Sequence, residues 1–432
     1  VASGVWSLDS QFEAQSSSIW PLAFPNTTIA NSLRFNSASD DNLSRTPSSA
    51  SNRKTFTISA WVKKTNLGNT QTIIDARIDS NDNCSIFFNT DDNIFIKFKV
   101  SPTSQNTSLT TNRKFRDVSA WYHIVLAVDM TQGTDTNRVK LYVNGIQETS
   151  FSSATYLTQN TDTTYNNTNE HQLGSRVADT SQDFDGYIAE FVMVDGQQLD
   201  PTSFGAFNPV TNIWEPIAYA GTYGTNGFRL DFADSSALGN DVSGNDNDFT
   251  VNNLTSIDQS TDTCSNNFVT LNPLNQNPSN QFVLENGNLS VASSTAVGTK
   301  NHGSSTIGVS SGKWYCEFKV DSGSYSVIGV SSDPSELARN NQDCGYYSSG
   351  WGYYQALGTI RNNDSGSAYG NTLSAGDILG IALDLDNSKL YFSKNGTFQN
   401  SGDPTSGSTG TGAVSITSGQ TYFFVTGDAD GS

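Results

Sequence analysis

Two stretches of the chain, 121–147 and 378–396, repeat one pattern that few folds can accommodate. The first reads WYHIVLAVDMTQGTDTNRVKLYVNGIQ and the second reads ILGIALDLDNSKLYFSKNG. In each, an apolar run is followed by a polar turn, an alternating run and an Asn-Gly pair. Val139, Leu141 and Val143 recur at every second position, which is the spacing of a strand with one buried face. An Asn-Gly pair supplies the positive φ angles that a tight hairpin needs. The repetition predicts two domains of one β architecture.

The composition is that of an all-β chain. The 432 residues suffice for two or three domains, and Gly, Asn, Ser and Thr are abundant while long helical patterns are absent. The net charge is −19 at pH 7, but only 15% of the residues are charged, and Lys and Arg are scattered. Because nucleic-acid binding needs clustered Lys and Arg, we expect none. No run approaches the ~20 apolar residues that span a bilayer, so we expect no membrane span.

Turns and polar stretches divide the chain into four parts. Residues 1–30 carry isolated aromatic anchors and two prolines that break any regular element, and we interpret them as an extended arm that docks on a neighbouring domain or subunit. Residues 31–207 and 266–432 are the two strand-rich domains. Residues 208–265 are too polar to pack except through a few apolar side chains. They are either a structured linker, which we favour because flexible linkers carry fewer aromatics, or early strands of the second domain.

Ordered motifs within both domains resemble known families. Residues 31–207 contain in succession SLRFN, FTISAWVKK, WYHIVLAVD, VKLYVNG and DGYIAEFVMVDGQQL. Their order and spacing resemble a laminin-G-like, concanavalin A-like jelly roll. Residues 266–432 contain GKWYCEFKV, YSVIGVSSD and GDILGIALDLDNSKLYFSKNG, which resemble a SPRY domain. Together the resemblances imply an all-β fold of two concanavalin A-like jelly-roll β-sandwiches joined by a structured linker.

The order of the domains, with GTYGTNGFRLDFADSSALGNDVSGNDNDFTVNN between them, resembles large structural proteins of tailed bacteriophages, especially marine ones. That resemblance implies a protein of the virion surface, either a fibre or a capsid or tail appendage. It also implies that the protein contacts other virion proteins, forms a homo-oligomer and binds a glycan or protein of the host surface through loops at the sandwich edge. Two alternatives are a secreted bacterial carbohydrate-binding adhesin and a capsid decoration without a ligand.

Neither the acidic residues nor the histidines form a catalytic pattern. Glycoside hydrolases of this architecture place Glu-x-Asp-x-Glu on one strand so that two carboxyl groups face one cleft, and no such run occurs here. His123 lies in an expected strand, where a packed imidazole is the simplest interpretation. His171 and His302 belong to no catalytic motif, and neither a nucleophile elbow nor His-Glu-x-x-His is present. We therefore predict a binding protein and not an enzyme.

The four cysteines do not indicate a zinc site. Cys84, Cys264, Cys316 and Cys344 form no CxxC pair, and none lies near a histidine in the sequence. Cys316 alternates with apolar residues, so we expect a core thiol. A disulfide between Cys316 and Cys344 is left open.

Calcium is the one ion that the sequence favours, because loop carboxylates and carbonyls are the ligands it prefers. Asp79, Asn81 and Asn83 have the spacing that opens a calcium loop, although Cys84 stands where such a loop has its turn glycine. Two further aspartates before Gly186 are a second candidate, because laminin-G-like domains often bind calcium at loop ends. The alternative for both sets is Asx-turn residues that cap exposed loops. The second set consists of Asp183 and Asp185.

A dense aromatic patch in the second domain is the candidate for ligand binding. Its glycines and serines predict an exposed loop, and Tyr and Trp are the residues that recognition surfaces prefer. In SPRY-like domains the binding surface is built from loops at one end of the sandwich. The alternative is that Trp351 and Tyr353 are core residues. The candidate residues are Tyr346, Tyr347, Trp351, Tyr353 and Tyr354.

Overall fold

The computed structural model describes residues 27–102, 106–277, 281–293, 300–323, 325–340 and 342–428. The chain divides into two units, Val1–Phe268 and Val269–Ser432. The arm predicted over residues 1–30 falls outside the described residues up to residue 26. The described helices are short, and none could span a bilayer.

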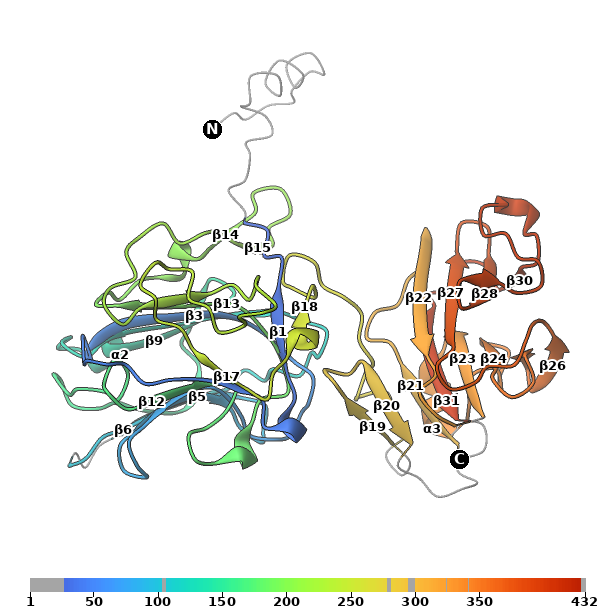
Figure 1. The fold of residues 1–432 in the computed structure, drawn as a ribbon. Coiled ribbons are helices and arrows are strands. Elements are labelled where there is room, and N and C mark those ends of the chain that lie inside the picture. Colours follow the sequence, from blue (N-terminus) through green and yellow to red (C-terminus); the bar gives the residue numbers. More distant parts are fainter. Residues whose placement is uncertain are drawn as a thin grey trace, which may run out of the picture. The chain divides into compact units, whose positions relative to one another are not determined.

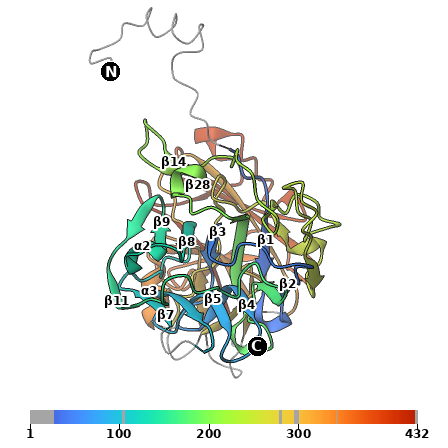
Figure 2. The same cartoon turned by 90° about the vertical axis from the view of Figure 1, so that its left-hand side faces the viewer.

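The first unit is a sandwich of two antiparallel sheets, which lie one above the other in Figures 1 and 2. One sheet has the order β10 (Ile146–Glu148), β9 (Val139–Val143), β8 (Tyr122–Asp129), β3 (Thr55–Lys64), β13 (Gly186–Asp195), β1 (Ser32–Phe35) and β18 (Gln259–Ser260), with β16 (Phe228–Leu230) paired to β13. The other has the order β11 (Phe151–Thr155), β7 (Thr107–Thr111), β6 (Ile94–Lys99), β5 (Asn83–Phe88), β4 (Gln71–Arg77), β12 (Glu170–Leu173), β2 (Asn42–Arg45) and β17 (Thr250–Asn252). A small hairpin of β14 (Gly205–Phe207) and β15 (Trp214–Pro216) and the short helix α2 (Asp135–Arg138) lie outside the sheets.

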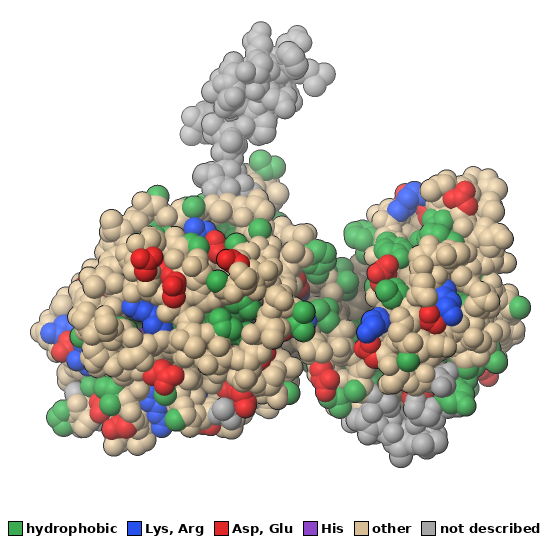
Figure 3. All heavy atoms as spheres, viewed as in Figure 1, with side chains coloured by type: hydrophobic (Ala, Val, Ile, Leu, Met, Phe, Trp, Pro, Cys, Tyr) green, Lys and Arg blue, Asp and Glu red, His purple; other side chains and the backbone are tan. Residues whose placement is uncertain are grey.

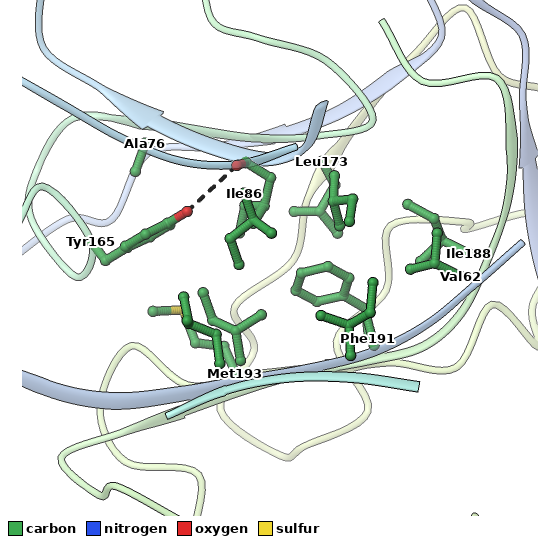
Figure 4. Packing of buried hydrophobic residues seen from close by; sticks show 14 of the residues in the cluster. Val62, Ala76, Ile86, Tyr165, Leu173, Ile188, Phe191 and Met193 are labelled. Carbon is green, nitrogen blue, oxygen red and sulfur yellow. Dashed lines mark hydrogen bonds between the residues drawn. The ribbon is translucent and has the colours of Figure 1, made fainter. Parts of the chain in front are cut away.

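The core of the first unit lies between the two sheets. Figure 4 shows Val62, Ile188, Phe191 and Met193 of one sheet pointing toward Ile86 and Leu173 of the other. These side chains are buried because every second residue of each strand faces the opposite sheet. The hydroxyl of the buried Tyr165 donates to the carbonyl of Ile74 at 3.4 Å, so its polar atom is not left without a partner in the core.

The segment predicted as a linker, 208–265, belongs to the first sandwich. Its strands β16, β17 and β18 pair with β13, β2 and β1. Its apolar side chains Phe232, Leu238 and Phe249 are buried in the same core. The polar composition concealed this contribution because strands at a sheet edge need only a few inward side chains. The described structure therefore contradicts the prediction of a separate linker.

The two ends of the first unit are held together. Pro216 accepts a hydrogen bond from the amide of Thr27 at 2.9 Å. The amide of Ile29 donates to Ser265 Oγ at 3.0 Å, and Thr263 Oγ1 donates to the carbonyl of Ile29 at 2.8 Å. Strand β1 meets β18 with Ser32 opposite Ser260, so the entry and the exit of the unit lie side by side.

The second unit is a smaller sandwich. One sheet has the order β21 (Asn301–Ser304), β31 (Phe423–Asp428), β23 (Ser326–Ser331), β24 (Gly350–Tyr354), β25 (Thr359–Asn362) and β26 (Ser365–Ala368). The other has the order β22 (Lys313–Lys319), β27 (Ile378–Asp384), β28 (Lys389–Lys394) and β29 (Thr397–Phe398), with β30 (Val414–Ser415) paired to β28. The hairpin β19 (Phe282–Glu285) and β20 (Ser290–Ser293) and the helix α3 (Pro334–Asn340) complete it. The predicted fold class of two concanavalin A-like β-sandwiches is confirmed.

The repeated sequence pattern corresponds to a repeated structural element. Strands β8, β9 and β10 form consecutive antiparallel pairs, and β27, β28 and β29 do the same. At the second turn of each set, Asn144 and Gly145 have φ of 48° and 79°, and Asn395 and Gly396 have φ of 49° and 79°. The turn chemistry that the sequence predicts is thus realised in both units.

Candidate functional site

The candidate site is a polar hollow at a loop end of the first unit, here called the Asp183 hollow. It has a volume of about 670 Å³. Three loops that are distant in sequence build it: the segment after β3, the 3-10 turn Ser37–Ser39 after β1, and the 3-10 turn Thr180–Gln182 before β13. Its lining is mostly hydroxyl, amide and carboxylate groups: Ser37, Asn66, Asn69, Thr70, Gln71, Phe87, Thr90, Ser181, Gln182, Asp183 and Asp185.

Asp185 ties the three loops together. Its carboxylate accepts hydrogen bonds from the amide of Ser37 at 2.9 Å and from Ser37 Oγ at 2.8 Å. Asn66 Nδ2 donates to the same carboxylate at 3.2 Å. The amide of Asp185 donates to Gln71 Oε1 at 3.3 Å. Both carboxylate oxygens are thus occupied by protein donors, and Asp185 fixes the shape of the hollow.

Asp183 also lines the hollow, and one of its two carboxylate oxygens has no hydrogen-bond partner among the described residues. Its residue is 4% exposed, and its Oδ1 accepts from Ser175 Oγ at 2.6 Å. Its Oδ2 is buried and has no hydrogen-bond partner among the described residues. The pKa of Asp183 is raised to about 7, mainly by burial and in addition by the nearby carboxyl group of Asp40, while the hydrogen bond from Ser175 opposes the rise. A negative charge on Asp183 is therefore costly unless a proton or a cation compensates it.

The Asp183 hollow fits calcium in part. Asp183 and Asp40 supply two carboxylates, and an unpartnered buried oxygen is what a hard cation would satisfy. The described residues contain no group of three or more His, Cys, Asp or Glu side chains that could hold an ion. A calcium ion would therefore take its remaining ligands from carbonyl, amide, hydroxyl or water oxygens, which calcium accepts.

The other calcium candidate, formed by Asp79, Asn81 and Asn83, does not fit the ion. Asp79 Oδ1 accepts from the amides of Asn81 and Asp82 at 2.6 and 2.9 Å, which is an Asx turn. The ammonium of Lys99 donates to Asn81 Oδ1 at 3.0 Å, so a cation already sits where the metal would lie. Asn83 is buried, and its Nδ2 donates to two carbonyls of the turn. These residues have the capping role that was the alternative interpretation.

The aromatic patch of the second unit is split by its strand. Trp351 and Tyr353 point inward from β24 and are 8% and 0% exposed, so they are core residues. Tyr354 lies on the opposite face, with the guanidinium of Arg361 5.9 Å from its ring centroid. Tyr346 and Tyr347 are half-buried and meet edge to face at 5.0 Å. The five residues therefore do not form one surface, because alternation along β24 separates Trp351 and Tyr353 from Tyr354, while Tyr346 and Tyr347 lie in the turn before the strand.

The different burial of Trp351 and Tyr347 predicts different losses of stability when each is replaced by alanine. Trp351→Ala is expected to lower the free energy of unfolding of the second unit by about 3 kcal/mol, because it removes a large core side chain. Tyr347→Ala, the matched aromatic in the turn, is expected to change it by no more than about 1 kcal/mol. Denaturant unfolding followed by hydrogen exchange of the second unit measures both values. Equal losses for the two variants would contradict the core assignment of Trp351.

The sequence pattern did not reveal several residues that line the Asp183 hollow, nor Asp40, which lies beside Asp183. Asp40 follows a 3-10 turn in the left-handed conformation, with φ of 56°, and no motif connects it to a residue far along the chain. The amides Asn66, Asn69 and Gln182 belong to loops whose Asn and Gln are not distinguishable from turn residues by sequence. Phe87 contributes a ring from β5 that lies 4.9 Å from the ring of Phe95.

Both predicted families are found in the chain. A family model described as the concanavalin A-like lectin/glucanases superfamily, of the laminin G type, matches residues 37–199. A model of the SPRY domain matches residues 313–422. The chain carries a concanavalin A-like domain followed by a SPRY domain. The Asp183 hollow lies in the concanavalin A-like domain, and the split aromatic patch lies in the SPRY domain.

Two solved structures are similar to parts of the chain. The SPRY domain of human HERC1 is 20% identical, and the match covers 31% of this chain and 77% of that chain with a TM-score of 0.24. The native heptameric SAP-like pentraxin from Limulus polyphemus is 14% identical, and the match covers 45% of this chain and 90% of that chain with a TM-score of 0.30. No curated protein matches the sequence.

Proposed function

We propose that the chain is a non-enzymatic binding protein that recognises a glycan at the Asp183 hollow with the help of a calcium ion. The observation that carries the proposal is the buried Oδ2 of Asp183, which lacks a hydrogen-bond partner among the described residues, in a residue that lines a hollow of amides and hydroxyls. Amide and carboxylate groups hydrogen-bond sugar hydroxyls, and the ring of Phe87 offers an apolar face for a pyranose. A bound calcium ion would supply a positive charge to which neighbouring hydroxyl oxygens coordinate.

The binding function has a proposed setting on the virion surface of a tailed bacteriophage, as a fibre or as a capsid or tail appendage. Support comes from the order of the concanavalin A-like and SPRY domains and from the segment between the repeated motifs. The face shown in Figure 3 is mainly neutral and polar, with isolated acidic and basic side chains, and such a surface suits weak contacts with sugars. Proteomics of purified particles tests this setting. A protein found only as a secreted bacterial adhesin would contradict it.

Calcium binding is tested with one substitution and its matched control. Asp183→Asn is expected to reduce calcium affinity at least about tenfold, measured by calorimetry, because it removes a charged ligand. Asp79→Asn, in the loop closed by Lys99, is expected to leave calcium affinity unchanged. Asp183→Asn also removes the repulsion from Asp40, so the fold is expected to survive. Equal calcium affinity in both variants would contradict the site.

The glycan ligand is tested on an array of host-type glycans with and without calcium. We expect binding by the wild type in calcium and its loss after Asp183→Asn. The same substitution at Asp79 serves again as the control. An array that stays blank for the wild type would contradict glycan recognition, whereas binding that is independent of calcium and of Asp183 would contradict the hollow as its place.

The raised pKa of Asp183 gives the calcium affinity a pH dependence. Below a pH of about 7 the carboxyl group holds a proton, which calcium must displace. We therefore expect affinity to fall by up to about tenfold for each pH unit below 7, for one displaced proton. Calcium titrations across this range measure the slope. A flat profile would mean that Asp183 does not take part.

A further inference from the structure

Basic side chains lie together on the outer face of the sheet that contains β4, β5 and β6. Along β6 every second side chain faces the core, so Lys97 and Lys99 point to the opposite face. Arg77 extends to the same face from β4, and Arg176 lies in the segment between β12 and β13. Burial lowers the pKa of Lys97, and the positive charges of these three neighbours lower it further, while Asp75 opposes the fall. Such a concentration of positive charge stands out in a chain whose net charge is −19.

Lys97 has no counter-ion. Its side chain is half-buried, and its ammonium forms no hydrogen bond or ion pair with a residue that the structure describes. Asp75 lies in the same cross-strand row, but its carboxylate is already engaged. One of its oxygens accepts from Ser85 Oγ, and the other accepts from the amide of Val177 at 3.2 Å. A half-buried ammonium without a partner is costly, and an anion from outside the chain would compensate it.

A small pocket lies between Lys97 and Arg176. Its volume of about 40 Å³ holds about three water molecules, so it admits a carboxylate, sulfate or phosphate group but no sugar ring. Arg176 Nη1 is ion-paired with Asp179 at 3.0 Å, and its other guanidinium nitrogens donate to no described residue. Phe87 and Gln182 line both this pocket and the Asp183 hollow. A ligand in the hollow can therefore place one small group beside Lys97.

We propose that the glycan recognised at the Asp183 hollow is acidic and that Lys97 and Arg176 bind its anionic group, a carboxylate, sulfate or phosphate. This inference rests on the proposed glycan-binding function and adds the chemical class of the ligand. A guanidinium presents two donors to two oxygens of one anion, and an ammonium adds a donor from another direction. Both side chains are half-buried, which excludes part of the surrounding water and strengthens the attraction. The sugar ring that carries the acid would lie against Phe87, on the rim that the pocket and the hollow share.

The test measures binding of the full chain, in calcium, to an array of neutral, carboxylated, sulfated and phosphorylated glycans built on shared cores. Lys140→Gln is the matched control for Lys97→Gln, because Lys140 of β9 is also a half-buried lysine without a hydrogen bond or ion pair to a described residue. We expect the wild type to prefer acidic over neutral glycans of the same core. Lys97→Gln should weaken binding of the acidic glycans by about tenfold, the loss expected for one charge-assisted hydrogen bond, and Lys140→Gln should not. Lys97→Arg keeps the charge and should retain the preference.

The outcomes separate this inference from the function on which it rests. The anionic group that is preferred on a shared core identifies the acid. Binding confined to neutral glycans, or equal binding of acidic glycans by Lys97→Gln and Lys140→Gln, would overturn the inference and leave glycan recognition at the hollow in place. An array that gives no signal for the wild type would overturn both. Calorimetry with calcium alone should give Lys97→Gln the affinity of the wild type, because Lys97 is not a calcium ligand. A loss of calcium affinity in this variant would mean that Lys97 supports the fold and does not bind the acid.

Discussion

Asp262→Ala is expected to lower the free energy of unfolding of the first unit by about 4 kcal/mol, because it leaves a buried lysine without its counter-ion. Lys63 Nζ donates to Asp262 Oδ2 at 2.8 Å, and the two side chains are 0% and 5% exposed. Trp121 Nε1 donates to the other oxygen at 3.0 Å. Burial lowers the pKa of Lys63 while Asp262 opposes that effect, so removing Asp262 removes what keeps the lysine charged.

Denaturant unfolding of the wild type and three variants measures this effect. Asp162→Ala, which breaks an exposed ion pair with Lys54, is the control and is expected to cost no more than about 1 kcal/mol. The double variant with Lys63→Met and Asp262→Leu is expected to recover most of the loss, since an apolar pair replaces the buried charges. If Asp262→Ala cost as little as Asp162→Ala, the segment around Asp262 would not belong to the cooperative unit.

Acidification is expected to destabilise both units through three buried histidines. Burial lowers the pKa of His123 to about 3, of His171 to about 4 and of His302 to about 3 from an ordinary value of 6.5. Below pH 6.5 these histidines therefore bind protons in the unfolded chain but not in the folded chain. Their contribution to the free energy of unfolding is complete at neutral pH and is lost as the pH falls. Each histidine is expected to cost about 2 kcal/mol at about pH 5, which gives about 4 kcal/mol for the first unit, with His123 and His171, and about 2 kcal/mol for the second unit, with His302.

The surroundings of the histidine rings explain the lowered pKa values and suggest His302→Leu as a control variant. His123 Nδ1 accepts from Trp214 Nε1 at 2.9 Å, which leaves the proton on Nε2, 2.8 Å from Ser59 Oγ. Neither ring nitrogen of His302 has a hydrogen-bond partner among the described residues. His302→Leu is therefore expected to remove the acid sensitivity of the second unit without loss at neutral pH.

Hydrogen exchange at several pH values reports each unit separately. In the first unit Asp183 acts with the opposite sign, because its raised pKa favours protonation of the folded form below pH 7 and offsets about one histidine. The first unit of Asp183→Asn should consequently be more acid-sensitive than that of the wild type. A second unit that stays equally acid-sensitive after His302→Leu would show that another group is responsible.

Sequence patterns within short stretches predicted the hairpins but not the pairing of strands that are distant in the sequence. The hairpins around Asn144 and Asn395 were predictable because alternation and turn chemistry lie within one short stretch. The placement of 208–265 was not, because its strands pair with partners at the beginning of the chain and with β13. A polar segment that contributes Leu238 and Phe249 to a distant core has no periodic signature of its own.

In the candidate site, too, the local features were predictable from the sequence and the long-range contacts were not. Asp183 and Asp185 were predicted from their place before a strand in a laminin-G-like pattern, and the structure assigns them different tasks, one as an anchor and one with a free oxygen. Their surroundings were not predictable, because Asp40 approaches Asp183 and Asn66 approaches Asp185 only after folding. For Trp351 and Tyr353 the alternation along the strand outweighed the glycines that predicted a loop.

The hydrogen bonds that hold the two ends of the first unit together have a mechanical consequence. Strands β1 and β18 run antiparallel with Ser32 opposite Ser260, so the chain enters and leaves the unit at the same end of the pair. Tension along the polypeptide would break the hydrogen bonds between the two strands one after another, in the unzipping geometry. It would not load all of them at once, as in the shear geometry. The contacts of Ile29 with Thr263 and Ser265 would yield first, and the sandwich behind them would carry no load until they had parted.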